Sequence, residues 1–175
     1  MTDNAPIPVT PADLTTSPDL AQALLALNNA HAVELSWLEP PRLAHMVGEA
    51  FLAERIGEAE ALLLAFDQDA DYDSPNFLWF RDRFPRFVYV DRIVVAARAR
   101  GRGHARRLYQ LLFERARAAG HERVVCEVNS NPPNPASDAF HADLGFTVVG
   151  TGELHGGEKT VTYLERRWGS RTGAG

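Results

Sequence analysis

Residues 87–107 read FVYVDRIVVAARARGRGHARR, an apolar run followed by a stretch rich in glycine and arginine. The apolar run from Phe87 to Val95 is typical of a buried strand, and an amphipathic helix is expected after the last arginines. Between them, five arginines surround two glycines. Glycine lets backbone N–H groups approach a ligand closely, and the free N–H groups at a helix N-terminus favour an anion. Because arginine adds forked donors and positive charge, the stretch predicts a phosphate-binding loop.

This loop resembles the acyl-CoA pyrophosphate loop of the GNAT N-acetyltransferases. The family pattern is Gln or Arg, two residues, Gly, one residue, then Gly or Ala. Two registers of the chain fit it, one beginning at Arg98 and the other at Arg100. Downstream, Asn134, Ser137 and the run FHADLGF over 140–146 resemble the second family signature, a helix that Asn opens and a Gly-Phe pair closes. Together the two signatures span about residues 87–147.

The resemblance implies an α/β fold, the single-domain GNAT fold, with a mixed, twisted sheet of six or seven strands and helices on both faces. It also implies that the strands over 87–95 and 122–128 splay apart to admit acetyl-CoA as cosubstrate. The expected cofactor-binding residues belong to the first strand, the loop and a later helix. They are Ile93, Val94, Val95, Arg100, Gly101, Arg102, Gly103, His104, Ala105, Asn134 and Ser137.

Length and composition favour one domain over residues 1–175, with loose termini over 1–9 and 169–175. With 45% hydrophobic and 23% charged residues, the chain has the composition of an ordinary globular protein. No apolar run approaches the roughly 20 residues of a membrane span, and Met1–Thr16 lacks the regions of a signal peptide. We therefore expect a cytoplasmic protein without a membrane partner.

Periodicity and turn signals predict the remaining elements. Expected helices cover 18–29, 41–49, 105–119 and 136–143, and expected strands cover 51–56, 61–66, 87–95, 122–128, 146–149 and 160–164. Ser17-Pro18-Asp19 is typical of a helix start, and Gly120 is typical of a helix end.

The segment 67–85 is too long for a simple hairpin loop, and aspartates alternate over its first seven residues. A calcium loop of the EF-hand kind is rejected, because Tyr72 and Leu78 stand where that pattern needs Gly and Glu. Two hypotheses remain. The segment is either a solvated acidic loop, or a lid that receives a cationic substrate through its charges with Tyr72 and Trp79.

Acetyl transfer to an amine needs a base, and Asp91 is the first candidate. Strand alternation predicts that it shares a face with Tyr89, Ile93 and Val95. A carboxylate in an apolar strand is costly to bury, which indicates either a catalytic task or a salt bridge or hydrogen bond to a neighbouring loop. Glu127, on the adjacent expected strand, is the weaker candidate for the same role.

His141 stands where many members of the resembled family carry a tyrosine that protonates the departing thiolate. The resemblance therefore implies His141 as general acid, although a packed histidine is the alternative. His104 is expected to supply a backbone N–H rather than chemistry. No metal is expected, since the histidines and Cys126 lack ligand spacing, and Cys126 is expected to be a small core residue.

The function expected from these residues is acetyl transfer from acetyl-CoA to a primary amine of a small molecule or peptide, by direct attack in a ternary complex. The alternatives are a non-catalytic acyl-CoA-binding regulator, a nucleic-acid-binding module that uses the arginine run, and an enzyme that acts on hydroxyl groups. Nucleic acid is disfavoured as a partner, because the chain carries a net charge of −5. The sequence leaves the acceptor open, and the resemblance makes a homodimer possible.

Overall fold

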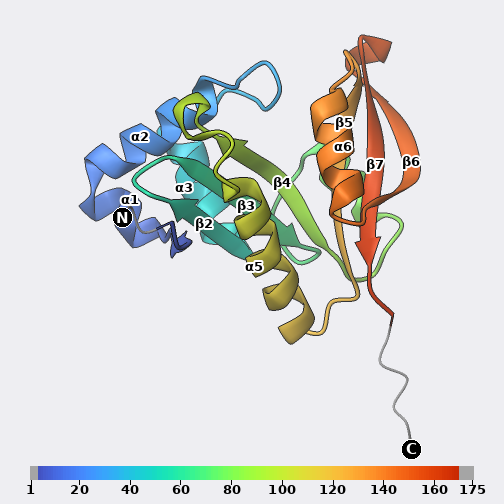
Figure 1. Cartoon of the computed structure of the whole chain (residues 1–175), viewed down its shortest axis with the longest axis horizontal. Helices are drawn as coiled ribbons and strands as arrows, with labels where there is room; N and C mark the ends of the chain where they lie inside the picture. Colours follow the sequence, from blue (N-terminus) through green and yellow to red (C-terminus); the bar gives the residue numbers. More distant parts are fainter. Residues whose placement is uncertain (1–3, 170–175) are drawn as a thin grey trace, which may run out of the picture.

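The computed structural model describes residues 4–169, which form a seven-stranded sheet in the order β1-β2-β3-β4-β5-β7-β6 (Figure 1). All neighbouring strands pair antiparallel except β4 and β5, which are parallel. The strands are β1 (Ile7–Pro8), β2 (Leu52–Ile56), β3 (Ala61–Asp67), β4 (Val88–Val95), β5 (Arg123–Asn131), β6 (Thr147–Leu154) and β7 (Lys159–Arg167). The expected mixed sheet is confirmed.

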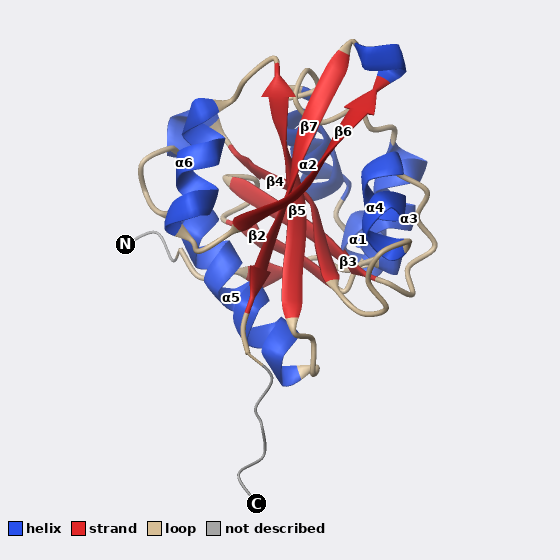
Figure 2. Cartoon of the chain, turned by 90° about the vertical axis from the view of Figure 1, so that its right-hand side faces the viewer, coloured by secondary structure: helices blue, strands red, loops and turns tan. Residues whose placement is uncertain are grey.

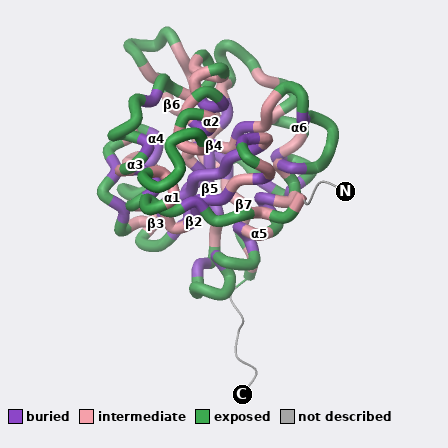
Figure 3. Tube along the Cα trace, turned by 90° about the vertical axis from the view of Figure 1, so that its left-hand side faces the viewer, coloured by how far each residue is buried: buried purple, intermediate pink, exposed green. Residues whose placement is uncertain are grey.

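Helices cover both faces of this sheet (Figure 2). One face carries α1 (Pro11–Thr16), α2 (Pro18–Asn29), α3 (Pro40–Glu49) and α4 (Pro75–Arg81), and the other carries α5 (His104–Ala118) and α6 (Pro135–Asp143). Each face has its own buried cluster, the first around Met46 and Phe77 and the second around Leu112 and Phe146. Burial is concentrated on the central strands (Figure 3). The predicted α/β class is confirmed.

The N-terminal segment is more ordered than its composition suggested. Ile7–Pro8 pair with Arg55 and Glu54 of β2, and the N–H of buried Val9 donates to the carbonyl of Ala53 at 2.9 Å. The expectation of a loose terminus is therefore wrong for residues 7–9. The other expected loose end, 169–175, lies outside the described residues beyond Gly169.

The sheet opens between β4 and β5. Their pairing consists of Val88 with Val124 and Tyr89 with Val125, after which the strands separate (Figure 1). Within the described chain, β4 beyond Tyr89 has no strand partner on its β5 side. Backbone groups of β4 are thus available to an extended ligand, as the resemblance implied.

A β-bulge shapes β4 at the start of this opening. Leu64 of β3 pairs with Arg92 and Ala65 pairs with Val90, so Asp91 has no partner in the β3 register. The extra residue inverts the alternation of side chains. Tyr89 packs in the cluster beneath α1–α4, whereas Ile93 and Val95 pack in the cluster beneath α5. The prediction that Asp91 shares one face with all three is therefore wrong.

Candidate active site

A cavity of about 500 Å³ occupies the opening between β4 and β5. Residues from both faces of the sheet line it. From the α3–α4 face come Arg42, Tyr72, Ser74 and Asn76, from the α5–α6 face come Tyr109, Asn134, Ser137 and His141, and from the strands come Asp91, Ile93, Cys126 and Glu127. A molecule that enters from one face can therefore meet a molecule that enters from the other.

The structure brings several of the predicted site residues to this cavity and leaves others outside its lining. Asp91, Ile93, Asn134, Ser137 and His141 are lining residues. The loop residues 100–105 and the end of β4 at Val94–Val95 are not, and the loop leads from that strand into α5. Sequence reasoning missed Tyr109 and Asn76, because Tyr109 lies in the apolar pattern of a helix and Asn76 lies in a segment without periodicity.

The phosphate loop has the backbone that its glycines suggested. Gly101 and Gly103 have φ values of +78° and +77°, and Gly103 is the N-cap of α5. The backbone N–H groups of residues 102–106 form no hydrogen bond to any part of the chain that the structure describes. A Cβ at either glycine would meet nothing within 4 Å. The loop therefore presents open N–H groups and free space, which suits an anion.

His104 begins α5 and is buried beside Glu60 of the β2–β3 turn. Its Nε2 lies 3.1 Å from Glu60 Oε2, and Arg102 lies 3.8 Å from the other oxygen of Glu60. The side chain of His104 is thus fixed behind the loop, while its backbone N–H stays free at the helix N-terminus. This geometry agrees with the expectation that His104 contributes a backbone donor.

Asp91 uses both carboxylate oxygens within the protein. Oδ1 accepts from the Tyr72 hydroxyl, and Oδ2 accepts from Arg92 Nε at 2.6 Å. The side chains of Asp91 and Arg92 are each only 5% exposed. This is the salt bridge that the sequence left open as the alternative, and it leaves the Asp91 carboxylate poorly suited to accept a substrate proton.

Glu127 is held differently. Its Oε1 accepts from Asn76 Nδ2 and from the Tyr89 hydroxyl, each at 3.0 Å, and the Tyr163 hydroxyl donates to Asn76 Oδ1. Its Oε2 is buried and has no hydrogen-bond partner among the described residues. Burial, assisted by the nearby charge of Asp91, raises the pKa of Glu127 to about 8. A base poised near neutral pH is what proton abstraction requires, so the geometry favours Glu127 over Asp91.

His141 is buried against Tyr109. Its Nδ1 lies 2.8 Å from the carbonyl oxygen of Ser137, which can only accept, so Nδ1 carries the proton. Nε2 then accepts from the Tyr109 hydroxyl at 2.7 Å. Burial lowers the pKa of His141 and raises that of Tyr109. His141 is consequently neutral with both nitrogens engaged, and the group it orients is the hydroxyl of Tyr109.

The acidic segment lines the cavity through Tyr72, Ser74 and Asn76, but its charges point elsewhere. Asp71 and Asp73 are 88% exposed and pair with His45 and Arg42 of α3. None of its four alternating aspartates lines the cavity, although Tyr72 does. Trp79 stacks on Tyr163, with 4.0 Å between ring centroids, instead of facing a substrate. The solvated-loop hypothesis fits this arrangement better than the lid hypothesis.

Other chemistry has little support in residues 4–169. Over that range, no group of three or more His, Cys, Asp or Glu side chains is arranged to hold a metal ion. Cys126 is buried, and burial raises the pKa of its thiol. Within the same range, no helix is both long enough and apolar enough to cross a bilayer.

Comparison with known proteins places this site in a family. The solved structures that share the fold include the following three. YncA of Salmonella typhimurium, solved with its cofactor acetyl-CoA, superposes with a TM-score of 0.69 at 18% identity, covering 99% of this chain and 98% of its own. The ribosomal-protein-S18-alanine N-acetyltransferase of Escherichia coli gives 0.65 at 16% identity, covering 97% and 98%. The ribosomal-protein-alanine N-acetyltransferase of Brucella melitensis gives 0.65 at 21%, covering 93% and 99%.

Comparison of the sequence with protein-family models decides which family the chain belongs to. No curated protein matches the chain. The model of the acetyltransferase (GNAT) family does match, over residues 29–146. That range includes the phosphate loop, the opening between β4 and β5, and the signature that ends at Phe146. The chain therefore belongs to the GNAT family of acetyltransferases.

Proposed function

We propose that the protein transfers the acetyl group of acetyl-CoA to a primary amine by direct attack in a ternary complex, with Glu127 as the general base. One observation carries the assignment of the base. The cavity between β4 and β5 contains a carboxylate with one unpartnered oxygen and a pKa of about 8. The use of acetyl-CoA is supported by family membership and by the open loop at α5.

The reaction forms a bond between the amine nitrogen and the thioester carbonyl carbon and breaks the bond between that carbon and sulfur. Glu127 Oε2 accepts the proton that the nitrogen loses. Because Asn76 and Tyr89 already donate to Oε1, the carboxylate is oriented before the amine arrives. Such positioned proton transfer contributes about 10²–10⁴-fold to the rate.

We assign stabilisation of the departing thiolate to Tyr109. A thiol with a pKa of about 8.5 is a stronger acid than Tyr109, whose pKa is raised well above its usual range by burial. Tyr109 would therefore stabilise the thiolate by turning its single hydroxyl proton from His141 Nε2 to the sulfur as a hydrogen bond, rather than by giving that proton up. Until the thiolate forms, His141 orients that hydroxyl, so the proposal replaces the general-acid role expected for His141 with a positioning role.

The cofactor assignment has a matched test. Gly103 and Gly120 stand at opposite ends of α5 with φ values of +77° and +80°. An alanine at either position bears similar backbone strain, about 1–2 kcal/mol. Only Gly103→Ala places a methyl group among the free N–H groups of the loop. We expect calorimetry to show CoA binding weakened about tenfold or more in Gly103→Ala, with Gly120→Ala close to the parent. Equal affinities in both variants would contradict the loop assignment.

The alternative is a non-catalytic acyl-CoA-binding regulator. The deciding experiment measures thiol release from acetyl-CoA with spermidine, glucosamine, free amino acids and a peptide that begins with alanine. The peptide is included because two proteins of the same fold are ribosomal-protein alanine N-acetyltransferases. Acetylated amine and free CoA in equal amounts support the proposal. Tight CoA binding without thiol release for any amine favours the regulator.

A further inference from the structure

The ion pair of Asp91 and Arg92 has contacts that the proposed reaction does not use. Besides Asp91, the Arg92 guanidinium donates to Asn28 Oδ1 at 2.7 Å and reaches Ser36 Oγ at 3.5 Å. Asn28 is fully buried near the end of α2, and Ser36 belongs to the segment 30–39 between α2 and α3. One buried side chain on β4 therefore contacts both the last turn of α2 and the connection that follows it.

The segment 30–39 depends on these contacts for its position. Asn28 Nδ2 donates to the Ser36 carbonyl at 2.8 Å. Asn29 brackets Leu38, accepting from its N–H at 2.9 Å and donating to its carbonyl at 3.1 Å. Its apolar burial is limited to Leu38 and Leu35, which pack in the cluster beneath α1–α4, since Val33 is 89% exposed and Trp37 is 64% exposed. Between its two ends the segment is therefore held by polar contacts to Asn28 and Arg92 together with the apolar packing of Leu35 and Leu38.

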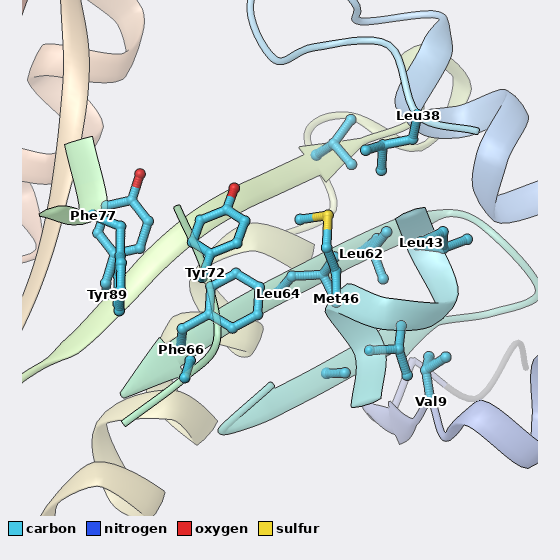
Figure 4. Packing of buried hydrophobic residues seen from close by; sticks show 14 of the residues in the cluster. Val9, Leu38, Leu43, Met46, Leu62, Leu64, Phe66, Tyr72, Phe77 and Tyr89 are labelled. Atoms are coloured by element: carbon cyan, nitrogen blue, oxygen red, sulfur yellow. The ribbon is translucent and has the colours of Figure 1, made fainter. Parts of the chain in front are cut away.

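The same ion pair reaches the opposite wall of the cavity. The Tyr72 hydroxyl donates to Asp91 Oδ1, and the Tyr72 ring stacks on Phe66, with 4.4 Å between ring centroids. Figure 4 shows the hydroxyls of Tyr72 and Tyr89 on the same side of the buried cluster. Glu34, Leu35 and Ser36 line the cavity from one segment, and Tyr72 and Ser74 line it from the other. Both segments therefore meet at the bulge of β4.

We propose that the Asp91–Arg92 pair positions segment 30–39 as a wall of the acceptor-binding half of the cavity, so that Arg92 sets acceptor affinity without acting in the chemistry. That the bound molecule is an acceptor amine rests on the proposed function, whereas the position of segment 30–39 as a wall rests on geometry alone. A buried ion pair often stabilises the folded protein no more than apolar packing would. The pair is therefore better explained by the arrangement of segments that it fixes than by a gain in stability. The rigid fork of arginine can serve Asp91, Asn28 and Ser36 at once, which a lysine cannot do.

Two variants and a control test the proposal. Arg92→Lys keeps a cation for Asp91 but loses the reach to Asn28 and Ser36. Asn28→Ala leaves the ion pair intact and removes the link to the segment. Gln22→Ala, on the exposed side of α2, is the control. Because the buried Asn28 variant risks poor folding, the lysine variant carries the test if thermal unfolding shows that the alanine variant is not native.

The first readout is hydrogen–deuterium exchange of a peptide over residues 31–38, which needs no substrate. We expect faster exchange there in both variants, unchanged exchange in α5, and no change in the control. The second readout is steady-state kinetics with acetyl-CoA and whichever amine of the panel turns over fastest. Loss of a hydrogen bond to a charged group predicts an amine KM raised about tenfold, with kcat and CoA affinity within twofold of the parent.

The possible outcomes distinguish failure of the proposed wall from failure of the proposed function. Unchanged exchange in both variants overturns the proposal whatever the kinetics show. Faster exchange with an unchanged amine KM also overturns it, because the segment would then not contribute to acceptor binding. A fall in kcat without a change in KM would place the pair in the chemistry and contradict the positioning role. If no amine reacts with the parent protein, the proposed function fails while exchange still decides whether Arg92 holds the segment.

Discussion

Asp91 and Glu127 line the same cavity from the two strands that separate, yet their surroundings differ in kind. Asp91 faces a guanidinium and a phenol that together occupy both of its oxygens. Glu127 faces only neutral donors, which share one oxygen and leave the other without a partner. A cation favours the ionised carboxylate, whereas burial among neutral groups favours the protonated form.

The comparison shows that position on a strand does not assign a catalytic role. A buried carboxylate with a cationic partner has its charge compensated and holds its neighbours in place. A buried carboxylate without one keeps a raised pKa, and it can exchange a proton near pH 8. Under the proposed function, the same residue class supports structure on β4 and chemistry on β5.

The largest expected effect comes from Glu127→Gln, which keeps the shape and removes the proton acceptor. We expect kcat at pH 7.5 to fall about 10²–10⁴-fold, while CoA affinity measured by calorimetry stays within twofold. The control is Glu122→Gln, because Glu122 is a half-exposed carboxylate just before the same strand. If Glu127→Gln retains full turnover, the base is not Glu127, and the different surroundings of Glu127 and Asp91 do not explain which residue is catalytic.

Asp91→Asn is expected to act on stability instead. Removing one partner of a buried ion pair leaves the Arg92 charge uncompensated, which typically costs about 3–5 kcal/mol of unfolding free energy. Denaturant unfolding at pH 7.5 measures this loss. A variant that unfolds like the parent but turns over 100-fold more slowly would restore Asp91 as the base.

The raised pKa of Glu127 also predicts a change in stability with pH. The pKa of Glu127 is raised on folding, so the unfolded chain binds fewer protons between about pH 4.5 and 8 and stability falls as pH rises through that window. Glu127→Gln removes this penalty. Its melting temperature should therefore exceed that of the parent at pH 8.5 and approach it at pH 4.5, each kcal/mol corresponding to about 2–4 °C for a chain of this length.

Local signals in the sequence were sufficient for the elements around the phosphate loop. The apolar run of β4, the paired glycines and the periodic start of α5 each follow from short-range rules, and the structure contains all three. The short strand β1 was missed, because two residues carry no periodicity and Ile7–Pro8 are ordered only by pairing with β2.

The candidate site was only partly predictable, since its decisive features are long-range. Asp91 was found from its apolar surroundings, but the bulge that turns it toward Arg92 arises from a register shift against β3. Glu127 ranked second because the contacts that distinguish it are long-range, with Asn76 of α4 donating to it and Tyr163 of β7 donating in turn to Asn76. Tyr109 carried no signal, as a tyrosine in an amphipathic helix is usually part of the core.

The smallest expected effect comes from a comparison of two tyrosine variants. Each of these tyrosines donates a hydrogen bond to one of the two carboxylates. The Tyr89 hydroxyl lowers the pKa of Glu127 by donating to Oε1, so Tyr89→Phe should raise it further. The alkaline rise of kcat/KM would then shift upward by less than about one pH unit, the equivalent of one net hydrogen bond. Tyr72→Phe removes the matching donor to Asp91, whose charge stays paired with Arg92, and should leave that apparent pKa in place. A shift in the Tyr72 variant with none in the Tyr89 variant would mean that the titrating base is Asp91, because the observed pKa follows the carboxylate whose hydrogen bond was removed.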